Sequence, residues 1–564
     1  MFEIKIAPID WFVLIAYLVI VSVIGVIASA RIKNTSNYFL GSRRFGRWLM
    51  IAQSFGTGTH AEMPVSLAGV VYSMGLSGIW YQWKNLFATP FYWLLAPLFR
   101  RFRRTTIAEV VTDRYGPSMG TMYTVFALCF FTINMASMLK GAAKVIDQAI
   151  GGNLPVNGIV IAMTIVFVIY SFIGGLVATA WTDLLQGVLI IALSFMLIPA
   201  GWGLVGGIHD MKAGADLHRF SLMTPQGIGP WFIVVLTLNG LIGIVAQPQL
   251  ISSVGTGKDE LTCRIGHLCG TYIKRFCTVG WAIVGLIVAT VVARGSFGVT
   301  KLADPEEAFG FACRHFLFSG GVGLLIASFL AANMAASSAF MVDSGALFTK
   351  DIYRKYFAPS ESDRHYLWVG RVSGVAITLL AVCYAVFAIK RVLYSFLLTE
   401  TAATFVGISI LLGIFWKRAN RWGAASSIVV ALTVNFIGYY YTSRRLDAWE
   451  PNIFLLALLS GIVAAVVVSL LTAAEPRGAT DAFYRNLRTP SDLWSEGMPE
   501  EREPDQKRLA EAGRQLIVVN AFHLRRGACG VKIFRAYRID LLGFAFGWIV
   551  ALALILFVFL LFRL

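Results

Sequence analysis

The sequence predicts an all-α polytopic membrane protein. Three observations support this fold class: the composition, a series of apolar runs of bilayer length, and one such run that polar and charged residues break in its middle. Hydrophobic residues make up 57% of the chain and charged residues 14%, whereas a soluble domain carries about 25% charged residues. The mean hydropathy of +0.70 agrees with this prediction.

The net charge of +17 does not indicate a nucleic-acid-binding protein. The basic residues lie mostly in short loops between apolar runs, which is typical of the cytoplasmic loops of membrane proteins. No basic groove signature is present, so we expect no nucleic acid among the partners. The seven cysteines are scattered without C-x-x-C spacing, so the sequence predicts neither a zinc site nor a disulfide framework.

Apolar runs of bilayer length predict about fourteen transmembrane helices. They lie near residues 9–29, 48–74, 76–99, 118–149, 156–173, 176–204, 231–255, 271–293, 319–345, 366–388, 392–415, 423–441, 451–473 and 541–562. The first run is long enough to span a membrane, and its basic residues Arg31 and Lys33 follow it. We therefore expect a retained helix and not a cleaved signal peptide.

The basic residues of the loops predict the orientation in the membrane. Clusters at 31–47 and 100–114 follow the first and third runs, whereas the loops after the second and fourth runs carry no basic residue. Because positively charged loops stay in the cytoplasm, we expect a plasma or inner membrane protein with both termini outside the cytoplasm. Residues 474–540 then form a hydrophilic cytoplasmic loop, which is too small and too weakly apolar for an independent catalytic domain.

The run at 48–74 is interrupted by the segment GTGTHAEMP at 56–64. This segment places His60 and Glu62 near the bilayer centre, where a charged side chain costs about 2.5–3.5 kcal/mol. Its glycines and proline leave backbone groups unpaired, which is tolerated only where protein or a water-filled cavity satisfies them. The run at 231–255 is interrupted as well. Breaks in the two halves of a chain are typical of a binding site shared by inverted repeats.

Residues 174–189, GGLVATAWTDLLQGVL, resemble the signature of the sodium:solute symporter family, which includes sodium/glucose, proline and sialic acid carriers. Further similar segments follow the family order: YFLGSRR at 38–44, SLAG at 66–69, TIAEVVTDRYG at 106–116, LFTKDIYRKY at 347–356, GIFWKRANRWGA at 413–424 and FYRNLRTPSD at 483–492. The resemblance covers nearly the whole chain. It implies the LeuT-type fold, whose core is two inverted repeats of five helices, and the uptake of a small polar solute driven by a sodium gradient.

The same resemblance implies a division of the chain into six parts. They are an N-terminal helix and cytoplasmic loop at 1–47, the first core repeat at 48–204, the second core repeat at 205–415, two peripheral helices at 416–473, the cytoplasmic loop at 474–540 and a C-terminal helix at 541–564. One helix thus precedes the core and three follow it.

Family members hold sodium between backbone carbonyls of the first core helix and hydroxyls of the eighth. The resemblance places the two hydroxyl positions at Ala335 and Ala336, which carry no side-chain oxygen. Sodium is a hard cation that needs several oxygen ligands. Ser337 and Ser338 follow directly, although a shift of one or two residues turns a helix by roughly 100–200°.

Asp183 lies in the WTD motif, and similar positions in the family help to hold or release a cation. The alternative is a carboxylate that only stabilises a helix start through the helix dipole. The candidate cation ligands are Gly56, Thr59, Asp183, Ala332, Ser337 and Ser338.

Glu62 and His60 stand out from the residues themselves and not from the family pattern. A carboxylate at this depth can pair with Lys84 or Lys140, bind a cationic solute, or take up a proton. The alternative is a structural ion-pair network inside the helix bundle. The candidate solute-binding residues are Gly58, His60, Glu62, Lys84, Lys140, Asn239, Gln247 and Glu400.

We therefore expect a secondary active transporter that imports a small polar or charged solute, with sodium as coupling ion and no other cofactor. One alternative is a carrier of the same fold that is uncoupled or is coupled to protons through Glu62 or Asp183. A second is a non-transporting membrane sensor. We expect no enzyme, because no nucleophile, metal cluster or phosphate-binding loop occurs in a suitable context. No pattern predicts an oligomeric state.

Overall fold

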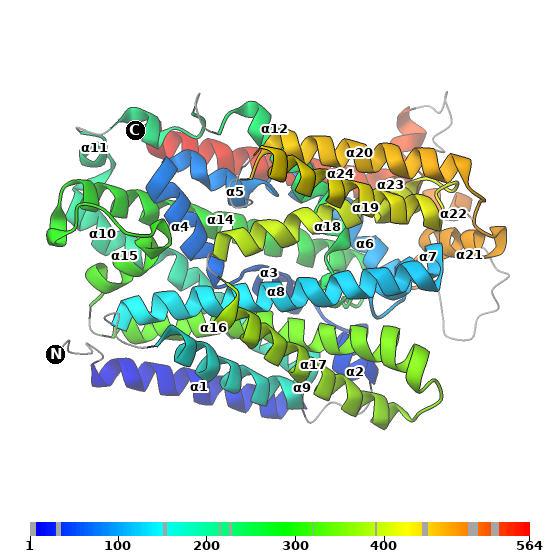
Figure 1. Cartoon of the computed structure of the whole chain (residues 1–564), viewed down its shortest axis with the longest axis horizontal. Helices are drawn as coiled ribbons and strands as arrows, with labels where there is room; N and C mark the ends of the chain where they lie inside the picture. Colours follow the sequence, from blue (N-terminus) through cyan, green and yellow to red (C-terminus); the bar gives the residue numbers. More distant parts are fainter. Residues whose placement is uncertain are drawn as a thin grey trace.

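The computed structural model of the protein describes residues 7–29, 35–150, 155–213, 216–224, 228–318, 320–389, 392–442, 449–493, 506–511, 513–520 and 530–563. Within these residues the named elements are helices, and the isolated β bridge joins Phe45 to Gly257. The long helices lie along the long axis of the molecule, with shorter helices and loops at its two ends (Figure 1). The predicted all-α class is confirmed.

The long helices form the body of the bundle. They are α1 (Pro8–Ser29), α8 (Pro117–Ile150), α9 (Val156–Phe195), α14 (Glu260–Ala293), α16 (Gly321–Leu347), α17 (Asp363–Phe387), α18 (Val392–Phe415), α19 (Arg421–Tyr441), α20 (Pro451–Leu471) and α24 (Gly530–Arg563). The part of the chain that the structure describes contains 10 helical segments long and apolar enough to span a membrane. The predicted number of about fourteen is therefore not confirmed.

The runs that account for the difference form broken or shorter helices. They are 48–74, which gives α3 (Arg47–Gly58) and α4 (Glu62–Met74); 76–99, which gives η2 (Leu76–Ile79), α5 (Trp80–Trp83) and α6 (Thr89–Arg101); 156–173, the first part of α9; and 231–255, which gives α12 (Pro230–Gly243), η4 (Ile244–Ala246) and α13 (Leu250–Val254). Glycine, proline and polar residues interrupt three of these runs, as the sequence predicts for the first and the last.

The remaining elements are short and connect or cap the long helices. They are α2 (Thr35–Leu40), η1 (Gly41–Arg43), α7 (Ile107–Tyr115), α10 (Leu197–Val205), α11 (Gly207–Lys212), η3 (Leu217–Phe220), η5 (Ser296–Gly298), η6 (Pro305–Glu307), α15 (Ala308–Phe316), η7 (Phe348–Phe357), α21 (Arg477–Arg488), α22 (Gln506–Glu511) and α23 (Ile517–Asn520).

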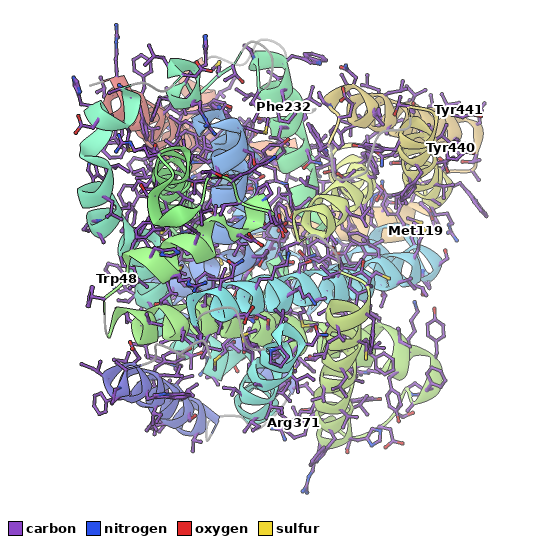
Figure 2. All side chains as sticks on the ribbon, turned by 60° about the vertical axis from the view of Figure 1, so that its left-hand side comes forward. Trp48, Met119, Phe232, Arg371, Tyr440 and Tyr441 are labelled. Carbon is purple, nitrogen blue, oxygen red and sulfur yellow. The ribbon has the colours of Figure 1, made fainter. Side chains whose placement is uncertain are left out.

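The outer helices expose apolar side chains, whereas α16 is almost entirely buried. Ile15 and Val19 on α1 and Leu552 and Leu556 on α24 are exposed, as contact with lipid tails requires. Trp48, Tyr440 and Tyr441 project from the surface of the bundle (Figure 2). Exposed aromatic residues at helix ends are typical of the membrane–water interface. The protein is therefore a multi-pass membrane protein.

A sharp bend at Gly175 divides α9 into the two predicted runs. Gly175 has φ +48° and ψ −155°, a backbone conformation that is open essentially to glycine alone. A Cβ at this position would also lie 2.4 Å from the Tyr38 ring. The glycine of the GGLVATAWTD segment thus sets the direction of the helical part that carries Asp183.

Described residues between 474 and 540 pack against the bundle. Arg101 at the end of α6 is 1% exposed and forms a two-pronged ion pair with Glu260 of α14, at 2.9 and 3.0 Å. The same guanidinium donates to the backbone carbonyls of Leu487 and Arg514. Arg264 of α14 pairs with Asp540 at 2.5 Å. The Arg264–Asp540 ion pair and the hydrogen bonds of Arg101 to two backbone carbonyls therefore attach the described residues of this region to α14 and α6.

Candidate functional site

A cavity lies where the broken helices α3/α4 and α12/α13 meet. Its walls come from α3, α5, α6, α8, α13, α14 and α18, and polar side chains line much of it. Among the solute-binding candidates, Gly58, His60, Gln247 and Glu400 line this cavity directly. The breaks provide the space because Thr59 and Gln247 have extended backbone where a continuous helix would pass.

Lys84 and Asn239 lie directly behind the cavity wall. Lys84 Nζ donates to Glu400 Oε2 at 2.7 Å and to Asn239 Oδ1 at 3.3 Å. The second oxygen of Glu400 accepts a hydrogen bond from Gln247 Nε2 at 3.1 Å. Lys84 also lies 5.1 Å from the ring centroid of Phe396. This network links the segment after α5, the break of α12 and helix α18.

His60 and Glu62 form a pair at the break between α3 and α4. His60 Nδ1 lies 3.0 Å from Glu62 Oε1, and His60 Nε2 lies 3.0 Å from the carbonyl oxygen of Thr57. Neither Lys84 nor Lys140 pairs with Glu62, so that possibility from the sequence was wrong. Glu62 Oε2 is buried without a hydrogen-bond partner among the described residues, and Glu62 lies in the first turn of α4, where the helix dipole stabilises its charge.

Lys140 lies outside this cavity. Its Nζ donates to Asn157 Oδ1 at 3.0 Å, near the start of α9. The residue occupies the same long helix as the cavity residue Asn134, but it faces the first turn of α9. The structure therefore does not bring Lys140 together with the other solute-binding candidates.

Lys274 and Arg275 on α14 line the cavity, and sequence reasoning missed both. The predicted run began at residue 271, which places them at a helix end where basic residues are ordinary. In the structure α14 begins at Glu260, after Asp259 caps it by accepting a hydrogen bond from the Thr262 amide. The capping aspartate was the signal that reveals the earlier start.

A second feature lies beside the cavity, where Asp183 of α9 contacts α3. Asp183 is fully buried, and neither carboxylate oxygen has a hydrogen-bond partner in the part of the chain that the structure describes. A Cβ on Gly56 would lie 2.9 Å from Asp183 Cγ, so Gly56 lets the carboxylate approach the α3 backbone. A buried carboxylate without donors is costly unless a cation or a proton accompanies it.

The α16 candidates face different neighbours. Ser337 Oγ donates to Asn333 Oδ1 at 2.7 Å and lies 3.9 Å from Met138 Sδ, so it faces α8. Ser338 Oγ donates to the carbonyl of Met334. Ala332, Ala335 and Ala336 are buried and contribute no side-chain oxygen, so Ser337 and Ser338 are the two hydroxyls in this stretch.

Ser338 faces the side of α16 that meets α1 and α9. The Tyr17 hydroxyl lies 3.6 Å from Met334 Sδ and accepts from Gln186 Nε2 at 3.2 Å. Residues three or four apart share a helix face. Ser338 therefore shares the Met334 face, and Asp183 shares the Gln186 face. This places the Ser338 side of α16 toward the part of α9 that carries Asp183.

Comparisons with known proteins agree with this architecture. The model of the sodium:solute symporter family matches residues 38–431. The osmoregulated proline transporter OpuE of Bacillus subtilis is 24% identical, with 83% of this chain and 96% of the relative covered. The high-affinity proline transporter PutP of the same organism is 26% identical, with 82% and 98% covered. The sodium/proline symporter of Salmonella typhimurium is 25% identical, with 84% and 96% covered.

A solved structure of a Na⁺-coupled sialic acid symporter, in a substrate-bound outward-open state, resembles this chain with a TM-score of 0.69. The sequence identity is 19%, and the match covers 83% of this chain and 99% of the other. At this identity the likeness concerns the fold. The LeuT-type arrangement that the signature implies is therefore confirmed.

Proposed function

The chain belongs to the sodium:solute symporter family, and on that premise we propose that it couples the import of a small polar solute to sodium entry through a cation site around Asp183. Secondary active transport is the activity of the family, and enzymatic activity is not. The observation that carries the residue assignment is the buried Asp183 carboxylate, which lacks donors among the described residues and packs against Gly56 of the broken helix.

The oxygens around Asp183 suit sodium, a hard cation. The proposed ligands are the Asp183 carboxylate, the backbone carbonyls of Gly56 and Thr59, and the hydroxyl of Ser338. The break after Gly58 supports this assignment, because carbonyls at a helix end lack intrahelical partners. The carboxylate compensates for the two hydroxyls that Ala335 and Ala336 do not supply.

The solute site in this proposal is the cavity at the two breaks. Gly58, His60, Gln247 and Glu400 line it. Glu62 holds His60 in place, and Lys84, which also contacts Asn239, holds Glu400. Three relatives are named for proline transport. Proline is therefore the first solute to assay.

The orientation and the division into parts also belong to this proposal. The start of α1 and the end of α24 lie at the same end of the bundle, and α7 and α21 lie at the other (Figure 1). The basic clusters at 31–47 and 100–114 support a cytoplasmic position for the end that carries α7 and α21. Both termini then lie outside the cytoplasm, and the two core repeats comprise residues 48–204 and 205–415.

Uptake into proteoliposomes under separate ion gradients tests the coupling ion. We expect proline accumulation with an inward sodium gradient at equal pH on both sides, and none when potassium replaces sodium. Accumulation driven by a proton gradient in sodium-free buffer would contradict sodium coupling.

Proton coupling is the second candidate function, and the same carboxylate favours it. The Asp183 carboxylate has no hydrogen-bond donor among the described residues, so a bound proton would neutralise its charge as well as a metal cation would. In that case uptake follows the pH gradient and is insensitive to sodium, so the two gradients distinguish the candidates.

A further inference from the structure

The cavity contains two cations without a carboxylate partner in the described parts of the chain. Lys274 Nζ donates to the backbone carbonyl of Gly58, and Arg275 Nη1 donates to that of Gln82 at 2.6 Å. Arg275 is 2% exposed, and its Nε has no hydrogen-bond partner. A buried cation without a counter-charge is costly, and inside a membrane protein such a residue marks a ligand pathway or site.

The nearby carboxylates are already engaged. Both oxygens of Glu400 accept hydrogen bonds, from Lys84 and Gln247. Glu62 Oε1 is held by its neighbour His60 at 3.0 Å, and neither Glu62 oxygen pairs with Lys274 or Arg275. Neither carboxylate therefore neutralises Lys274 or Arg275 by direct contact, and the positive charge on α14 is available to a solute.

The sum of the charged side chains in and behind the cavity wall is also positive. With Asp183 neutralised by the proposed cation, three basic side chains, Lys84, Lys274 and Arg275, stand against two carboxylates, Glu62 and Glu400, which leaves an excess of one positive charge with neutral histidines. A neutral sugar does not compensate this excess. A carboxylate does, because it brings a negative charge and only acceptor atoms.

Further unpaired polar groups of the cavity wall indicate which hydrogen-bonding groups the solute carries besides its carboxylate. The Tyr92 hydroxyl and His267 Nε2 lack hydrogen-bond partners, and the two rings stack with centroids 4.6 Å apart. On the acceptor side, Asn85 Oδ1 and Gln249 Oε1 are also unpaired among the described residues. These two amide oxygens require a donor from the solute.

We propose that the solute is a small carboxylate with an additional hydrogen-bond donor, and that Lys274 and Arg275 bind its carboxylate. Hydroxy acids carry both the negative charge and the donor, whereas zwitterionic amino acids present the same carboxylate to Lys274 and Arg275 and an ammonium donor to the amide oxygens, but add no net charge. The inference rests on the proposed function, since it names the solute class of the same cavity, and it assigns a specificity role to two residues of α14.

Thermal unfolding of the purified full chain in detergent measures binding without a gradient. The probes are matched pairs: L-proline with L-prolinamide, and lactate with lactamide, each with and without sodium. We expect the melting temperature to rise with at least one acid and not with its amide. The pair that responds distinguishes an amino acid from a hydroxy acid.

Variants at position 274 connect this response to α14. Lys274→Met should weaken acid binding by about tenfold to a hundredfold, the loss expected for a charge-assisted hydrogen bond. Lys274→Arg should retain most of the binding. Lys258→Met is the matched control, because Lys258 is exposed in the loop before α14. The Lys274→Arg variant also separates loss of charge from misfolding.

Several results would overturn the inference: amides that bind as tightly as acids, unchanged acid binding in Lys274→Met, or no response to either acid. Different results would refute the proposed function. Acid binding without sodium-driven uptake would refute sodium coupling and leave the carboxylate assignment intact, whereas sodium-driven uptake of a neutral solute such as glucose would do the reverse.

Discussion

Asp183 is a fully buried charge and Lys274 a half-buried charge of opposite sign, and neither has a charged partner in direct contact among the described residues. Each lies beside the break in α3, Asp183 against Gly56 and Lys274 on the carbonyl of Gly58. The break thus positions a carboxylate and an ammonium within one turn of the same helix end. In our proposals the first binds the coupling cation and the second the solute.

Replacing Asp183 tests the cation site. Asp183→Asn removes the charge and nearly preserves the shape, so we expect sodium to lose its stabilising effect in thermal unfolding. Without sodium the variant should be at least as stable as the wild type, because a buried unpaired charge has been removed. Asp210→Asn on the exposed α11 is the control. An unchanged sodium response in Asp183→Asn would refute the assignment.

The adjacent serines of α16 provide a matched pair. Ser338→Ala should raise the sodium concentration needed for half-maximal uptake by about tenfold, the effect of one lost oxygen ligand. Ser337→Ala should change it little, because Ser337 faces Met138 and Asn333. The measurement is sodium-dependent uptake at fixed solute. The reverse ranking would mean that α16 presents the other face to the cation.

At the scale of elements, the irregular segments carry the site. The breaks after Gly58 and Ala246 open the cavity, and the bend at Gly175 aims the helical part that bears Asp183. The residues that form these irregularities are glycines and polar residues inside apolar runs. They are therefore visible in the sequence.

Gly175→Ala tests the bend in α9. Alanine is strained at φ +48° and ψ −155°, at a cost of about 1–3 kcal/mol, and its Cβ would meet the Tyr38 ring. We expect a lower melting temperature and impaired uptake. Gly203→Ala in α10 should change little, since no atom lies within 4 Å of the added Cβ. Equal effects of the two changes would contradict the strain argument.

The sequence predicted the helix breaks but not all of the polar side chains that lie beside them. His60, Glu62 and Gln247 were predictable because a polar residue inside an apolar run is costly in a membrane and usually belongs to a functional site. Lys274 and Arg275 escaped prediction because hydropathy alone starts their helix at residue 271, whereas α14 begins at Glu260. The partners of Lys84, which are Asn239 and Glu400, depend on how distant helices pack, which a single sequence does not encode locally.

At the scale of the whole molecule, described residues after position 473 are attached to the transport core. Arg101 joins α6, α14, α21 and the segment before α23 through one guanidinium. Arg264 and Asp540 attach α24 to α14. The sequence predicted a hydrophilic cytoplasmic loop here because this region is weakly apolar, but it did not reveal the ion pair and the backbone hydrogen bonds that hold the described residues of the loop in place.

Glu260→Gln tests this attachment. The change leaves Arg101 buried without its counter-charge, which costs about 3–5 kcal/mol for a buried pair. We expect a clearly lower melting temperature. Asp113→Asn breaks the more exposed pair with Arg104 and should cost at most about 1 kcal/mol. Similar melting temperatures for the two variants would indicate that the attachment contributes little.

The two opposite charges beside Gly58, on Asp183 and Lys274, also couple the binding of the two transported species. In our proposals, when both species are bound the cation compensates Asp183 and the solute carboxylate compensates Lys274. With only one bound, a single uncompensated charge remains in a low-dielectric interior and makes closure around the site unfavourable. Strict stoichiometry then follows from electrostatic self-energy, without direct contact between the ion and the solute.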